Sequence, residues 1–98
     1  MAIARKIGYQ QAVGSDLANI GSIYYSKGEL DKALKYLAEA MLVFSAIGDR
    51  PNAEKAAGDL RPLLGQMGRE RFVAGCVEAG MTGEDAEKLA GSLAMPGE

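Results

Sequence analysis

The apolar residues of this chain recur with the period of a helix, and strand-like alternation is almost absent. Leu17, Ile20 and Tyr24 lie at positions i, i+3 and i+7, which places them on one stripe of a helix. Helix-forming residues dominate, so the expected fold class is all-α. The pattern predicts a helical tail near residues 1–8 and helices near 10–27, 30–47, 51–67, 69–79 and 84–94.

Glycines follow several of these apolar segments, at positions where a helix ends most easily in a left-handed conformation. They are Gly8, Gly28, Gly48, Gly68 and Gly80, and the first four are spaced 20 residues apart. Because glycine has no Cβ, it adopts a positive φ without strain, so each is expected to terminate a helix.

Two prolines and one threonine refine the predicted boundaries. Pro51 suits the first turn of its helix, where a missing N–H costs nothing, whereas Pro62 is expected to kink or split the same helix around residues 59–61. The segment 82–85 resembles a capping box, with Thr82 accepting from first-turn amides of a last helix.

The chain also resembles itself when it is shifted by 40 residues. Residues 1–8 align with 41–48, and Gly28 falls opposite Gly68. Between them apolar character persists without identity, because Leu17, Ile20, Ile23 and Tyr24 fall opposite Ala57, Leu60, Leu63 and Leu64. Self-similarity at a fixed period indicates repeated units of paired helices.

One stretch resembles the signature of the tetratricopeptide repeat, namely Leu17-x-x-Ile20-Gly21-x-x-Tyr24-x-x-x-Gly28 followed by Ala33-x-x-x-Leu37-x-x-Ala40. The resemblance implies an α-solenoid of antiparallel helix hairpins. Gly21 and Ala33 are expected where the two helices approach most closely, because only small side chains fit there. The stripe of Leu17, Ile20 and Tyr24 is then expected to pack on Leu30, Ala33, Leu34 and Leu37.

The 40-residue period is longer than the usual repeat of about 34 residues and resembles the repeats of kinesin light chain. Arg61, Pro62 and Glu70 depart from the signature in the second unit. We therefore expect a single tetratricopeptide-like domain over residues 1–98. Its parts are the end of a preceding repeat (1–8), a complete repeat (9–48), a degenerate second repeat (49–80) and a C-terminal capping helix (81–98).

Composition narrows the classes of partner. With 11 Lys and Arg against 13 Asp and Glu, the net charge is −2 and no single-sign field favours nucleic acid or anionic lipid. No apolar run reaches the roughly 20 residues that span a bilayer, and residues 1–6 lack the order of a secretory signal. The expected location is cytoplasmic, with no nucleic-acid or membrane partner.

The chain has no histidine and one cysteine, Cys76. This excludes an internal disulfide, His-based metal sites, and Ser-His and Cys-His nucleophile pairs, so we expect no metal, no cofactor and no enzymatic activity. Cys76 itself is expected to be a small buried hydrophobe and not a reactive thiol. The carboxylates after Thr82 are expected to cap a helix and not to form an acid–base pair or a cation site.

Candidate binding residues follow from the resemblance, because the first helices of such hairpins line a concave groove. Asn19 is the sharpest candidate, since an amide two residues before the signature glycine can clamp a peptide backbone with its donor and acceptor. The alternative for Asn19 is a solvated or helix-packing amide. The other groove candidates on this helix are Ser15, Ser22, Tyr25 and Ser26.

Two of these assignments leave alternatives. Asp59, which lies 40 residues after Asn19, either contacts a basic ligand residue or pairs with Arg61 or Lys55, and surface pairing is favoured. Tyr25 is either a ligand anchor or a contact to the neighbouring repeat.

The leading hypothesis is a protein–protein interaction module that binds a peptide or partner protein in its groove. The second is a structural role, as the end of a larger array or as a homo-oligomer, in which Ile3 and Ile7 of the half-repeat contact another chain.

Overall fold

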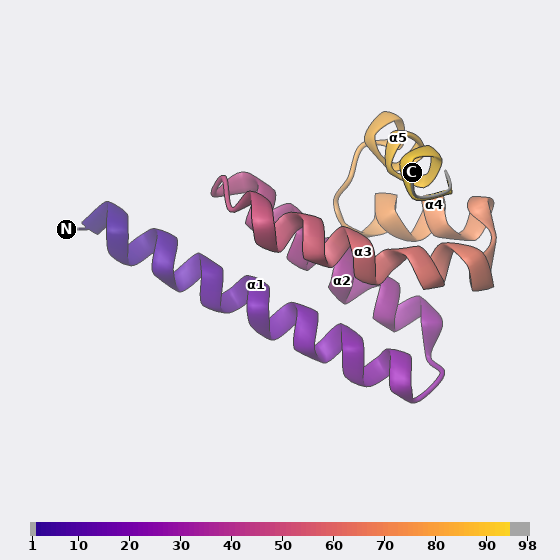
Figure 1. Ribbon diagram of the computed structural model, residues 1–98, viewed down its shortest axis with the longest axis horizontal. Coiled ribbons are helices and arrows are strands. Elements are labelled where there is room, and N and C mark those ends of the chain that lie inside the picture. The colour runs from indigo at the N-terminus through magenta and orange to yellow at the C-terminus, as the bar shows by residue number, and fades with distance from the viewer. Residues whose placement is uncertain (1, 95–98) are drawn as a thin grey trace.

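The computed structural model describes residues 2–94, with side chains from Gly8 onward, and contains five α-helices (Figure 1). The expected all-α class is confirmed, and no strand occurs within residues 2–94. Contacts expected from Ile3 and Ile7, and anything after residue 94, lie outside the described side chains. The helices are α1 (Ala2–Ser26), α2 (Leu30–Ala46), α3 (Arg50–Met67), α4 (Arg69–Ala79) and α5 (Gly83–Ala94).

Four of the five expected helix ends are confirmed. Gly28, Gly48, Gly68 and Gly80 have φ values of 80°, 74°, 87° and 121°, which side chains with a Cβ rarely adopt. The boundary expected at Gly8 is wrong, because α1 continues through it as one helix of 25 residues. Gly8 permits a helix end but does not impose one.

The expected effect of the prolines is confirmed for one of the two. Pro51 lies in the first turn of α3, whereas Pro62 lies inside α3 without splitting it. The helix hydrogen bond lost at Pro62 would have used the carbonyl of Gly58, and both residues are exposed. That carbonyl can therefore bond to water, which allows the helix to continue.

α1 and α2 form an antiparallel hairpin, and the two helices approach each other closely at two glycines of α1. A Cβ placed on Gly21 would lie 2.7 Å from Leu37 Cγ and 3.2 Å from the Ala33 carbonyl oxygen, and one on Gly14 would lie 2.8 Å from the Phe44 ring. The close approach expected at Gly21 is confirmed. The close packing expected for Ile20 is wrong, because 38% of this side chain is exposed.

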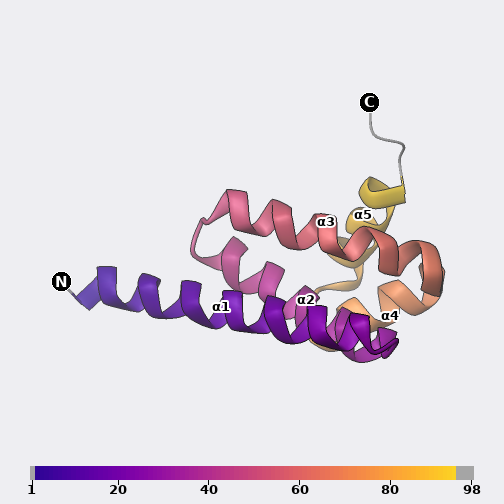
Figure 2. The same cartoon turned by 60° about the horizontal axis from the view of Figure 1, so that its bottom comes forward.

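The main core lies where α2, α3, α4 and α5 meet, and the partly buried Ala18, Tyr24 and Tyr25 of α1 pack against it (Figures 1 and 2). α5 contributes Ala86, Ala90 and Leu93 to this core. The hydroxyl oxygen of Thr82 accepts a hydrogen bond from the Asp85 amide at 3.1 Å at the start of α5, as the capping box predicts. The largest fully buried side chains are Phe72, Leu34, Leu37, Leu60, Leu63 and Cys76. Burial of each Leu or Phe contributes about 1.5–3 kcal/mol to folding.

Side chains also link helices that are not neighbours in sequence. Gln11 of α1 bonds to Asp49, which precedes α3, and Tyr25 of α1 bonds to Gln66 within α3. The bonded partners are 38 and 41 residues apart, and the Arg71–Asp31 pair that joins α4 to α2 is separated by 40. Since both α1–α3 links join residues in the same order along the two helices, α1 and α3 run in the same direction.

Candidate binding groove between α1 and α3

A shallow cleft of about 90 Å³ lies between α1 and α3, and we call it the α1–α3 groove. Polar side chains stand on both walls and apolar groups form the floor. Asn19 comes from α1, while Lys55 and Asp59 come from α3, and all three are exposed. The full lining is Ser15, Ala18, Asn19, Phe44, Asn52, Lys55, Ala56 and Asp59.

One end of the groove is fixed by the carboxylate of Asp49, which precedes α3. It accepts hydrogen bonds from Asn52 Nδ2 at 2.7 Å and from Gln11 Nε2 at 2.9 Å. The side-chain bond from Asn52, and then that from Gln11, lower the pKa of Asp49, because both stabilise the charged form. Asp49 thus starts α3 and ties it to α1.

The other end is fixed by Tyr25, whose hydroxyl oxygen accepts from Gln66 Nε2 at 2.8 Å. Tyr25 is half-buried, so part of its ring still faces solvent beside the groove. The Ser26 hydroxyl donates to the Ser22 carbonyl oxygen at 3.2 Å within α1, while the Ser22 side chain is exposed. These three residues flank the groove without lining its cleft.

Asp59 does not form the surface ion pair that was favoured for it. The ion pairs within residues 8–94 join Lys32 to Glu29, Arg69 to Glu87 and Arg71 to Asp31. Neither Arg61 nor Lys55 is paired with Asp59, although Lys55 lines the same cleft. The groove therefore presents one positive and one negative side chain to solvent.

Sequence reasoning missed Lys55, Asn52 and Gln66. The 40-residue shift contains the signal for two of them, since it places Ser15 opposite Lys55 and Ser26 opposite Gln66, just as it places Asn19 opposite Asp59. Asn52 follows from its position three residues after the helix-starting Asp49.

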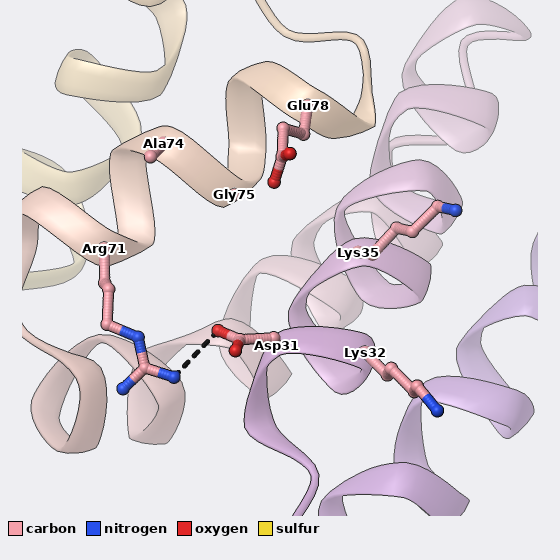
Figure 3. A pocket seen from close by; sticks show the side chains of 7 residues that line it. All are labelled: Asp31, Lys32, Lys35, Arg71, Ala74, Gly75 and Glu78. Atoms are coloured by element: carbon pink, nitrogen blue, oxygen red, sulfur yellow. Dashed lines mark hydrogen bonds and ion pairs between the residues drawn. The ribbon is translucent and has the colours of Figure 1, made fainter.

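A second hollow, of about 630 Å³ and so larger than the α1–α3 groove, lies between α2 and α4 and contains no residue predicted for binding (Figure 3). Arg71 and Asp31 occupy one side of it as an ion pair at 2.9 Å, and Glu29 at 3.2 Å raises the pKa of Lys32 through a hydrogen bond. Figure 3 shows Lys32 and Lys35 pointing away from the Arg71–Asp31 pair. Small-molecule pockets are mostly apolar. This charged, open hollow is therefore a weaker candidate for a binding site than the α1–α3 groove.

Cys76 and the remaining aromatic residues take structural positions. The Cys76 thiol is buried, as expected, and burial raises its pKa to about 11, which disfavours the reactive thiolate. Tyr24 stacks on Tyr36 with ring centroids 5.6 Å apart, and Phe44 is buried beneath α1. No cluster of three potential metal ligands occurs among the described residues, and none of their helices has the length and apolarity to cross a bilayer.

No protein-family model, curated protein or solved structure gives a significant match to this chain. The tetratricopeptide resemblance therefore remains a prediction, and the functional argument depends on the geometry of the α1–α3 groove.

Proposed function

We propose that the chain is part of a tetratricopeptide-like array whose α1–α3 groove binds an extended segment of a partner protein. The observation that carries this proposal is the position of Asn19, whose exposed amide shares the cleft with Lys55 and Asp59 from the neighbouring parallel helix. An amide supplies one acceptor and a donor group, the complement of a peptide unit.

The cross-helix bonds support the repeat part of the proposal. Contacts between residues 38, 40 and 41 positions apart are expected when units of about 40 residues stack side by side. They involve both the first helices, α1 with α3, and the second helices, α2 with α4. The same geometry makes α1 and α3 the two walls of one groove.

The dimensions of the groove favour a peptide over a small molecule. The cleft volume of about 90 Å³ is well below the roughly 300–1,000 Å³ of typical small-molecule pockets. It is large enough for one small side chain. Between the two closed ends, at Gln11 and Tyr25, α1 spans about 21 Å, which matches about six residues of extended chain.

The proposal is tested by panning a random-peptide phage library against the immobilised 98-residue chain and measuring the affinity of selected peptides by calorimetry. Asn19→Ala should weaken binding by about tenfold, because it removes hydrogen bonds to the peptide backbone. Asn19→Asp should also weaken binding, since it keeps the shape but replaces the donor by a second acceptor beside Asp59.

Ser92→Ala on α5 provides a control, since Ser92 is exposed and remote from the groove, and it should leave affinity unchanged. The assignment is wrong if the library yields no binder, or if the selected peptides bind both Asn19 variants as tightly as the unaltered chain.

A further inference from the structure

One face of α1, beside its contact with α2, exposes apolar side chains. Tyr9 is 72% exposed, Ile23 55% and Ile20 38%. Val13 is half-buried, and together with Tyr9 it lines a hollow beside Leu42 and Val43 of α2. Isolated exposed apolar residues are common, but a row of them on one helix usually marks a contact surface.

The spacing of this row is that of a coiled-coil seam. Tyr9, Val13, Asp16, Ile20, Ile23 and Lys27 are separated alternately by four and three residues. This alternation is the a and d pattern of a heptad, which keeps one stripe of a helix against a partner helix. We call these six residues the outer seam.

The outer seam contains one negative and one positive residue, placed symmetrically about two isoleucines. Asp16 precedes Ile20 by four residues, and Lys27 follows Ile23 by four. The Lys27 amide donates to the Ile23 carbonyl oxygen at 3.2 Å, so Lys27 continues the helical path beyond the last residue of α1. Neither Asp16 nor Lys27 takes part in the ion pairs of residues 8–94.

This symmetry decides the orientation of a partner with the same sequence. In a parallel, in-register pair, Asp16 would meet Asp16 and Lys27 would meet Lys27, and both contacts are repulsive. In an antiparallel pair, Asp16 lies opposite Lys27 of the other copy, and Ile20 lies opposite Ile23. The charges and the apolar residues are then matched at once.

We propose that the outer seam associates with the outer seam of a second copy of this chain, in antiparallel orientation and with Asp16 opposite Lys27. The matched part, from Asp16 to Lys27, spans about 17 Å of helix, so the dimer is expected to be weak and concentration-dependent. The contact differs from the one expected at Ile3 and Ile7. The outer seam adjoins the α1–α3 groove, because Asn19 lies three residues after Asp16 and four before Ile23 on the same helix, so dimerisation is measured without peptide.

The test is sedimentation equilibrium of the 98-residue chain from about 1 μM to about 1 mM. The unaltered chain should pass from monomer to dimer over this range. Asp16→Lys and Lys27→Asp should each weaken dimerisation by about tenfold or more, because each turns two attractive contacts of the dimer into repulsive ones. The double variant Asp16→Lys with Lys27→Asp should restore it, because the opposite charges again face each other.

A second pair of variants tests the apolar layers. Ile20→Ser with Ile23→Ser should abolish the dimer, whereas Val77→Ser should not, because Val77 is 44% exposed but lies on α4. Circular dichroism should show unchanged helix content in all variants, since every altered side chain is exposed. A chain that stays monomeric throughout, a dimer that tolerates the isoleucine changes, or a double charge variant that fails to dimerise would each overturn the proposal.

Discussion

At the scale of single residues, contact between α1 and α2 depends on missing side chains. Gly21 lies against Leu37 and the Ala33 backbone, and Gly14 lies against the Phe44 ring. Larger residues at these two positions would hold the helices apart, so the glycines determine how closely α1 approaches α2.

Gly21→Ala should destabilise the chain by up to about 2 kcal/mol. The added methyl group meets Leu37 Cγ at 2.7 Å, and overpacking costs about 1–3 kcal/mol, partly offset by about 1 kcal/mol of helix propensity. Gly58→Ala is the matched control, because beyond the neighbouring backbone of its own helix no atom lies within 4 Å of its added Cβ, and it should stabilise by about 0.5–1 kcal/mol. Urea unfolding measures both, and equal effects would contradict the packing argument.

The buried thiol of Cys76 should make stability depend on pH in alkaline solution. Its pKa is about 11 in the folded chain against 9.0 for the free group, so the folded state keeps a proton that the unfolded state releases. The resulting stabilisation is complete below pH 9 and is lost as the pH rises towards 11. Cys76→Ala should show a shallower decline over this window in urea unfolding, and an equal decline would contradict the assignment.

On α1, the position of a small residue at a helix contact could be predicted from the sequence more reliably than the position of a large apolar residue. Gly21 was correctly placed at the contact with α2, because a Cβ at this position would collide with Leu37. Ile20 was wrongly placed in that contact, because hydrophobicity alone does not distinguish a core position from an exposed seam. The same ambiguity hid the row formed by Tyr9, Ile20 and Ile23.

At the scale of helices, boundaries were predictable where local chemistry determines them. Gly28, Gly48, Gly68 and Gly80 adopt positive φ at helix ends, and Thr82 caps α5. Gly8 was misassigned because nothing after it prevents the helix from continuing. Whether Pro62 would split α3 depended on the solvent exposure of the Gly58 carbonyl, which is a property of the folded chain.

Thr82→Ala should destabilise the chain by about 1 kcal/mol, since it removes the only side-chain bond to the first amides of α5 among the described residues. Thr82→Ser keeps the hydroxyl group and should cost much less. Thermal unfolding followed by circular dichroism measures the difference, and equal melting temperatures for the two variants would contradict the capping role.

At the scale of the whole molecule, two adjoining faces of α1 have different proposed roles. One face forms the α1–α3 groove with Asn19, and the outer seam beside it carries Ile20 and Ile23. The side of α1 that bears Asn19 was predictable from the resemblance. The opposing residues Lys55 and Gln66 required the neighbouring helix to be placed in space, because their partners are about 40 residues away in sequence.

The central claim is that the α1–α3 groove binds a peptide, and NMR shift mapping tests it most directly. The ¹⁵N-labelled chain is titrated with a peptide selected by panning. We predict the largest shift changes at the Asn19 side-chain amide and at the backbone amides of Lys55 and Asp59. Changes confined to the hollow between α2 and α4, or to the outer seam, would contradict the claim.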